Sequence, residues 1–233
     1  ELIPVDDGAC LFADEITGRN GDCVEILYGG MPGDDSGGID AEIKQLAIRV
    51  HSSFHPQISS HLIQGKPVVP LAMVNEWCLS IAAALNPSVQ VMSVRDLSVV
   101  KGIQLEAFDG MGDWLNIDVK TGDTDGLLNM EVTDTNGVVH YQLSIELGGK
   151  NGSEPEQAAE SVASQEAVEM DKWEWTPKRI YEEFLFHGEK LQVVKQLLGV
   201  SAEGCKGMLQ MPDVKDVDWR VAMLDGGLQL ALL

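Results

Sequence analysis

The segment that decides the fold reads LAMVNEWCLSIAAAL and runs from Leu71 to Leu85. It is almost continuously apolar and rich in alanine, and Asn86-Pro87 follows it directly. Its length and alanine content favour a buried helix over a strand, and the proline would end that helix. The sequence therefore predicts one buried helix over residues 71–85.

Strand-like segments follow this helix, and the last of them alternates as VVHYQLSIEL. The turn Thr135-Asn136-Gly137 is typical of a hairpin between the final two. A buried helix followed by antiparallel strands implies a sheet wrapped around that helix, which is an α+β fold. The predicted strands are Val89–Leu97, Val99–Phe108, Trp114–Lys120, Leu127–Thr133 and Val138–Leu147.

The chain before this unit divides into two parts. Residues 1–30 predict a helix (Asp6–Ile16) and a strand (Cys23–Tyr28) that cannot bury their apolar faces alone, which is typical of the edge of a neighbouring domain. Residues 31–45 are rich in glycine, aspartate and proline near their start and predict a linker. The first sheet and helix are therefore expected over residues 46–149.

A second structured part is expected at residues 173–233, after a flexible acidic linker at 150–172 that has too few apolar residues to pack. The period of Pro177–Leu198 is helical or mixed, and Gly207–Val221 has strand character. Leu224–Leu233 predicts the start of another buried helix. We expect further strands beyond Leu233, so that this second part is incomplete.

Charge and cysteine usage exclude several classes of protein. With 16 Lys and Arg against 37 Asp and Glu, the 233-residue chain carries a formal net charge of −21, so phosphates would be repelled and no nucleic-acid partner is expected. The longest apolar run, Pro67–Val74, is too short to span a membrane. The cysteines have neither C-x-x-C pairing nor metal-binding spacing, which predicts a cytoplasmic protein with no metal site. They are Cys10, Cys23, Cys78 and Cys205.

The densest polar feature, HPQISSHLIQGKPVVP, precedes the buried helix at residues 55–70. In it, Gly65 permits a close backbone approach and Pro70 suits the first turn of a helix. A base at His61 beside free helix-start amides could remove a proton next to a carbonyl. A hydrogen-bonded structural role for His61 is the alternative. Structural roles are expected for the other histidines, His51, His55, His140 and His187.

A second polar feature, DGGLQ, occupies residues 225–229. On a helix the Gln229 amide can hydrogen-bond the Asp225 carboxylate and fix its rotamer, because positions i and i+4 share a face. The glycines Gly226 and Gly227 would leave open space where a substrate could approach. The alternative is an ordinary aspartate that stabilises the N-terminus of a helix.

These motifs carry a resemblance to a known family. His61-xxx-Gly65-xxxx-Pro70 is similar to the HxxxGxxxxP motif of polyketide synthase and fatty acid synthase dehydratase domains, and Asp225-xxx-Gln229 resembles their DxxxQ/H motif. Between them, Tyr181-xx-Phe184 with Gly188 and Leu191-Gln192 resembles the stretch YxxLxxxGxxxGPxFQ. The flanks look most like multifunctional polyunsaturated fatty acid synthases, and residues 1–30 resemble the C-terminal tail of a ketoreductase domain.

The resemblance implies a double hotdog, in which two antiparallel sheets each wrap a central helix, with the second hotdog truncated. It implies that His61 is the base and Asp225 the acid that eliminate water from a 3-hydroxyacyl thioester to give a trans-2-enoyl thioester. Gly65, Pro70 and Gln229 would orient the substrate. No cofactor is implied, because the substrate is carried on the phosphopantetheine of an acyl carrier protein.

The implied partners are an acyl carrier protein in the same polypeptide and the neighbouring ketoreductase, and a homodimer is compatible with the resemblance. Lys172, Lys178 and Arg179 form a basic cluster that could receive the carrier, or are simply solvated. Two other functions stay open: a catalytically silent acyl-binding or scaffold domain, and an aldol cyclase of the product-template type, which uses the same pair of residues.

Overall fold

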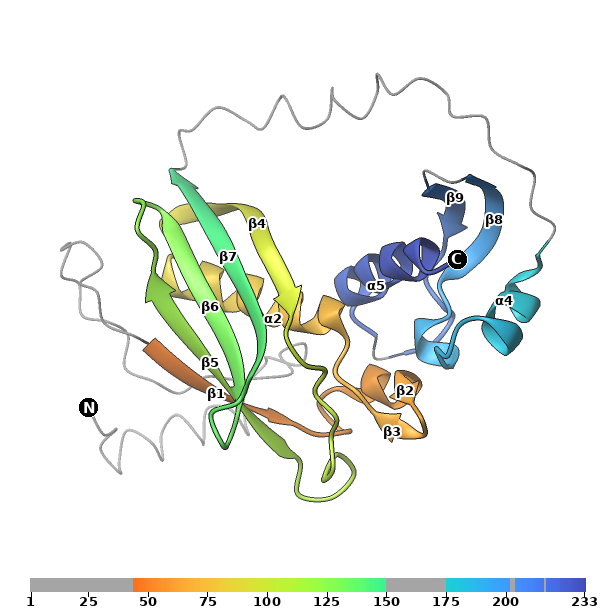
Figure 1. Cartoon of the computed structure of the whole chain (residues 1–233), viewed down its shortest axis with the longest axis horizontal. Helices are drawn as coiled ribbons and strands as arrows, with labels where there is room; N and C mark the ends of the chain where they lie inside the picture. Colours follow the sequence, from red (N-terminus) through yellow and green to blue (C-terminus); the bar gives the residue numbers. More distant parts are fainter. Residues whose placement is uncertain (1–43, 150–174, 202–203, 216) are drawn as a thin grey trace, which may run out of the picture. The chain divides into compact units, whose positions relative to one another are not determined.

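The computed structural model describes residues 44–149, 175–201, 204–215 and 217–233 (Figure 1). The ketoreductase-like tail at 1–30 and the acidic linker at 150–172 lie outside these residues, as does the linker at 31–45 up to residue 43. The last two residues of that predicted linker, Lys44 and Gln45, are already part of the first strand. Their pairing with Val119 and Asp118 explains this earlier start.

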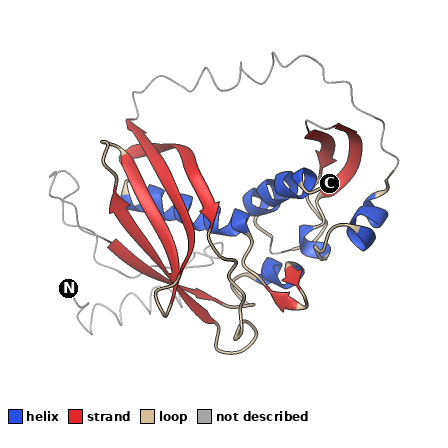
Figure 2. Ribbon diagram, in the orientation of Figure 1, coloured by secondary structure: helices blue, strands red, loops and turns tan. Residues whose placement is uncertain are grey.

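Five antiparallel strands form one sheet in the order β1-β5-β6-β7-β4. Apolar side chains alternate along the central strands, so that one face of the sheet is buried, and the sheet curves around α2 (Figure 2). The predicted arrangement of a sheet around one helix is confirmed. The strands are β1 (Lys44–Val50), β4 (Val89–Val99), β5 (Asp113–Thr121), β6 (Leu127–Asp134) and β7 (Val139–Gly149).

The central helix α2 (Leu71–Leu85) has the predicted bounds. It ends at Asn86, whose amide bonds to carbonyls of the last turn, and Pro87 follows. Pro70 lies one position earlier than predicted: it is the N-cap rather than a first-turn residue, and its carbonyl accepts the amides of Met73 and Val74.

The strand predicted at Val99–Phe108 is wrong. β4 ends at Val99, and the next nine residues are irregular apart from one isolated bridge between Val68 and Gln104. Their apolar side chains are explained by the core, because Ile103, Leu105 and Phe108 are buried in it without regular strand pairing.

The second part of the chain holds a two-stranded sheet and a longer helix. β8 (Val194–Ser201) pairs with β9 (Gly204–Leu209), and both contact α5 (Trp219–Ala231). The mixed segment resolves into α4 (Pro177–Glu183), the short helix η2 (Glu189–Leu191) and β8.

The boundaries predicted in this second part need correction. Strand character ends at Leu209, and α5 begins at Trp219 rather than at Leu224. The earlier start has a local cause: the Asp218 side chain accepts the amide of Arg220 and caps the helix.

The helices of the two parts contact each other. Val221 of α5 is buried in the core that contains α2, and Arg220 forms an ion pair of 2.9 Å with Glu76 on α2. These contacts fix the position of α5, which carries Asp225. Among the described residues, no helix combines the length and apolar character needed to cross a membrane.

Candidate active site

A tight hairpin positions His61. The strands β2 (Leu62–Ile63) and β3 (Lys66–Pro67) pair in antiparallel register and are joined by Gln64 and Gly65, which have φ angles of 53° and 79°. Positive φ at both turn residues is typical of a type I′ hairpin, in which glycine is favoured. The next pair of opposite positions outward is His61 and Val68, so the spacing of the motif brings these two residues together.

Hydrogen bonds across this hairpin fix the imidazole of His61. The Val68 amide donates to the His61 carbonyl at 3.0 Å, and His61 Nδ1 lies 2.8 Å from the Val68 carbonyl oxygen. Since a carbonyl can only accept, Nδ1 carries the proton and Nε2 keeps its lone pair. Burial lowers the pKa of His61, an effect that the carboxylate of Asp225 and the Val68 carbonyl oppose. The hairpin therefore presents a buried imidazole with a free basic nitrogen.

The second part of the chain meets this hairpin at a close backbone contact. The Gly188 amide donates to the Ser60 carbonyl at 2.7 Å, and His61 and His187 form an isolated antiparallel bridge. A Cβ at position 188 would lie 3.0 Å from Ser60 Oγ and 3.1 Å from its Cα, so a larger residue would push the segments apart. The approach that brings the two parts of the site together thus depends on glycine at position 188.

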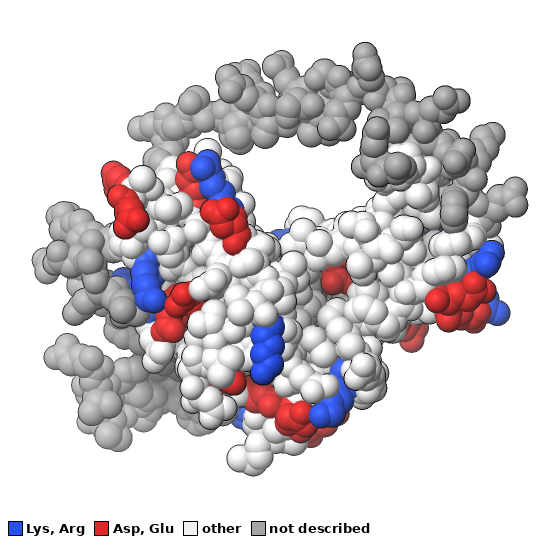
Figure 3. All heavy atoms as spheres, in the orientation of Figure 1, with Lys and Arg blue, Asp and Glu red and all other residues white. Residues whose placement is uncertain are grey.

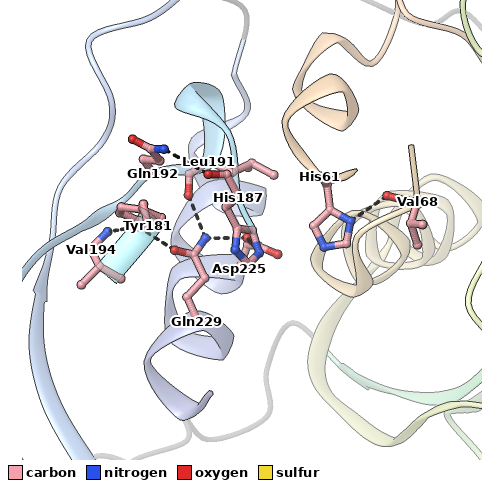
Figure 4. A network of polar contacts seen from close by, with 9 residues as sticks. All are labelled: His61, Val68, Tyr181, His187, Leu191, Gln192, Val194, Asp225 and Gln229. Carbon is pink, nitrogen blue, oxygen red and sulfur yellow. Dashed lines mark hydrogen bonds and ion pairs between the residues drawn. The ribbon is translucent and has the colours of Figure 1, made fainter. Parts of the chain in front are cut away.

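Asp225 lies in the middle of α5 and is 3% exposed. Gln229 Nε2 donates to Asp225 Oδ2 at 2.8 Å, which confirms the predicted i,i+4 hydrogen bond, and also donates to the Leu191 carbonyl. Tyr181 donates its hydroxyl proton to Gln229 Oε1 at 2.7 Å and accepts the Val194 amide (Figure 4). This chain of bonds sets the orientation of the Gln229 amide, so its NH2 group faces the acid.

Burial raises the pKa of Asp225 above its usual range, although the Gln229 hydrogen bond and the nearby His61 act in the opposite direction. The alternative role, an aspartate at the N-terminus of a helix, is wrong because Asp225 is the seventh residue of α5 and is buried. A raised pKa favours the protonated carboxyl, which is the form that can donate a proton.

The expected open space is absent at Gly226 and present at Gly227, but the space at Gly227 is not on the face of the helix that carries Asp225. A Cβ on Gly226 would lie 2.4 Å from Val193 Cγ2, so this glycine is needed for packing. Gly227 has no heavy atom within 4 Å of its Cβ position, but it is exposed and lies about 200° around the helix from Asp225. Gly65 lies in the turn of the hairpin and Pro70 is the N-cap of α2, and their expected role in orienting the substrate stays a prediction.

His187 was expected to be structural, but the structure places it in the site. Its Nε2 lies 3.4 Å from Asp225 Oδ2, and its ring is 5.3 Å from that of His61 between centroids. Burial lowers the pKa of His187 to about 4, so it is neutral near pH 7. The only sequence signal for it is its position directly before Gly188. One possible ligand atom each from His61, His187 and Asp225 lies within 4.8 Å of the others, so these three residues could hold a metal ion, which the sequence did not predict.

Comparison with known proteins supports the fold. No protein-family profile and no curated protein matches the chain. Among solved structures it is similar to the dehydratase domain from the CurF module of curacin polyketide synthase, with a TM-score of 0.64 and 18% identity over 83% of this chain and 71% of that domain. For the dehydratase domain of PpsC from Mycobacterium tuberculosis the TM-score is 0.58, with 17% identity over 81% of this chain and 67% of that domain.

A trans-AT polyketide synthase dehydratase domain from Brevibacillus brevis gives a TM-score of 0.59 and 14% identity, over 82% of this chain and 73% of that domain. The chain therefore has the hotdog fold of polyketide synthase dehydratase domains. In this fold the five-stranded sheet around α2 is the first hotdog, and α5 with β8 and β9 belongs to the second, as predicted.

Proposed function

We propose that the chain is the dehydratase domain of a multifunctional polyunsaturated fatty acid or polyketide synthase. It would eliminate water from a 3-hydroxyacyl thioester on an acyl carrier protein and give the trans-2-enoyl thioester. The observation that carries the proposal is the convergence of two groups from separate parts of the chain. One is the imidazole of His61, whose Nε2 is free, and the other is the buried carboxyl of Asp225.

The protonation states favour this reaction. Burial lowers the pKa of His61 and raises the pKa of Asp225, so both shifts favour the pair in which the imidazole is neutral and the carboxyl is protonated. A neutral imidazole can accept a proton, and a protonated carboxyl can donate one. An exposed aspartate, with a pKa of ~3.9, would be ionised at pH 7 and could not act as the acid.

His61 and Asp225 account for every proton that moves in the elimination. His61 Nε2 takes the α-proton, the electrons of that C–H bond form the α,β double bond, and the β-hydroxyl leaves with the proton of Asp225 as water. The products are the enoyl thioester, an imidazolium and a carboxylate. Return of a proton from His61 to Asp225, directly or through the released water, restores the starting state.

Two solved dehydratase domains agree with this chemistry. A histidine-to-phenylalanine form of the CurK dehydratase domain is an inactive mutant, and the PpsC dehydratase domain has been solved in complex with C12:1-CoA, an acyl thioester. By analogy, we infer an acyl thioester substrate and a required histidine for this chain.

Surface charge favours a carrier protein tethered in the same polypeptide. Carrier proteins are generally acidic, and this chain carries a net charge of −21. Of the predicted basic cluster, Lys172 lies outside the described residues. Lys178 and Arg179 pair with Glu182 and Glu183 one turn further along α4. On the face of the molecule shown in Figure 3, basic side chains lie beside acidic ones at several places. Tethering would supply the carrier at high effective concentration without charge attraction.

The test incubates the protein with a 3-hydroxyacyl carrier protein and follows the loss of one water by intact mass. His61→Ala and Asp225→Asn should abolish the loss. His140→Ala is the matched control and should keep the activity. Like His61, His140 is buried, and its Nδ1 lies within hydrogen-bond distance of a backbone carbonyl, that of Lys101, at 2.9 Å. Turnover near the wild-type rate in folded His61→Ala would refute the assignment.

The same experiment separates the alternatives. A folded wild-type protein that binds the acyl carrier but releases no water over several chain lengths would be the silent scaffold. Loss of water from a poly-β-ketoacyl substrate together with ring formation would indicate the aldol cyclase.

A further inference from the structure

Three buried side chains present metal-ligand atoms toward one point of the site. One ligand atom each from His61, His187 and Asp225 lies within 4.8 Å of the others. His187 Nε2 and Asp225 Oδ2 are 3.4 Å apart, which is long for an N–H···O hydrogen bond. Ligands about 2.0–2.1 Å from a tetrahedral zinc ion stand roughly 3.3 Å apart, so the spacing of this pair suits a shared ion. Separations of up to 4.8 Å within the group would have to shorten when the ion binds.

The third ligand, His61, is oriented as metal-binding histidines usually are. Its Nδ1–H donates to the Val68 carbonyl, which leaves the lone pair of Nε2 for an ion. The Asp225 carboxylate is held in turn by Gln229. The Nδ1 of His187 has no hydrogen-bond partner among the described residues, so no contact there fixes the tautomer, and Nε2 can serve as the ligand atom.

We propose that one divalent cation such as Zn²⁺ or Co²⁺ binds to His61, His187 and Asp225, and that this ion inhibits the enzyme. Two imidazoles and one carboxylate suit Zn²⁺ or Co²⁺, whereas Mg²⁺ and Ca²⁺ prefer oxygen ligands. Three protein ligands leave a fourth position for water. The ion would also neutralise the charge of the buried Asp225 carboxylate. Among the described residues, the only basic side chain within ion-pair distance of this carboxylate is that of His187.

The inhibitory effect rests on the proposed function. The ion would occupy the Nε2 lone pair of His61 that takes the α-proton. It would also require Asp225 as the carboxylate, so the carboxyl could no longer donate a proton to the leaving hydroxyl. One bound ion therefore blocks both the base and the acid, and inhibition should be complete at saturation and reversed by a chelator.

Binding is tested without any activity measurement. The chain, with its accessible cysteines alkylated and the buried Cys78 left unmodified, is titrated with Co²⁺ and followed by visible absorption, and with Zn²⁺ by calorimetry. We expect one ion per chain and the absorption of four-coordinate Co²⁺. His187→Gln and Asp225→Asn keep similar shapes but remove one ligand each, and should weaken binding at least roughly 100-fold. His51→Gln removes a histidine outside the cluster and should bind as the wild type does.

The outcomes separate this inference from the proposed function. A wild-type chain that dehydrates its substrate but binds no Zn²⁺, or binds it equally after His187→Gln and Asp225→Asn, overturns the metal site and leaves the dehydratase. Binding that depends on these residues in a protein without dehydratase activity keeps the metal site and removes the function. Water elimination that rises with added Zn²⁺ would overturn the inhibitory role.

Discussion

The two adjacent glycines of α5 give a sharp test of how Asp225 is held. Gly226→Ala adds a Cβ that would lie 2.4 Å from Val193 Cγ2 and 3.1 Å from a methyl of Leu209, whereas Gly227→Ala adds one with no heavy atom within 4 Å. Val193 is 1% exposed and has a short, branched side chain, so it cannot swing aside. The same substitution thus meets dense packing at one position and free space at the next.

The expected magnitudes follow from these contacts. Both variants gain about 1 kcal/mol from the better helix propensity of alanine. Carbon atoms usually stand about 3.5–4.0 Å apart, so Gly226→Ala requires a shift of roughly 1 Å. Such overpacking costs about 1–3 kcal/mol. We expect Gly227→Ala to raise the free energy of unfolding by about 1 kcal/mol over the wild type. The free energy of unfolding of Gly226→Ala should be about 1–3 kcal/mol lower than that of Gly227→Ala.

The assay is urea unfolding of both variants and the wild type, followed by tryptophan fluorescence, together with the water-elimination assay. Gly226→Ala should also reduce turnover, because the displaced helix carries Asp225 and Gln229, while Gly227→Ala should keep it. Equal stability and equal turnover of the two variants would refute the packing of α5 against Val193.

Three further predictions use paired variants or pH. Gly65→Ala and Gly137→Ala place alanine at φ angles of 79° and 78°, and each should lower the free energy of unfolding by about 1–2 kcal/mol. Only Gly65→Ala should lower turnover, and equal turnover of the two variants would refute a role of the hairpin in orienting His61. Tyr181→Phe should cost about 1–3 kcal/mol and lower activity through Gln229, whereas Tyr141→Phe should affect stability alone. Burial lowers the pKa of His187 to about 4, so as the pH falls His187 takes up a proton in the unfolded chain before it does in the folded one. The free energy of unfolding should therefore decrease between pH 6.5 and pH 4. In urea titrations the decrease should be about 3 kcal/mol larger for the wild type than for His187→Gln.

Features that depend on local chemistry were predictable from the sequence. The helix over residues 71–85 follows from a long apolar run closed by a proline, and its bounds agree with the structure. The hydrogen bond between Gln229 and Asp225 follows from their i,i+4 spacing on one helix. The strand wrongly predicted at Val99–Phe108 marks the limit of this reasoning, because a burial pattern does not distinguish a paired strand from an irregular segment packed on the core.

The sequence by itself determined the central helix, most of the strands around it, and the local spacing that sets Gln229 beside Asp225. Only the tertiary structure decided that His187 joins the site, that Gly226 packs on Val193 and that the pKa of Asp225 is raised. The reason is physical: periodicity and turn chemistry act between residues near in sequence, whereas burial and electrostatic shifts depend on which distant segments meet.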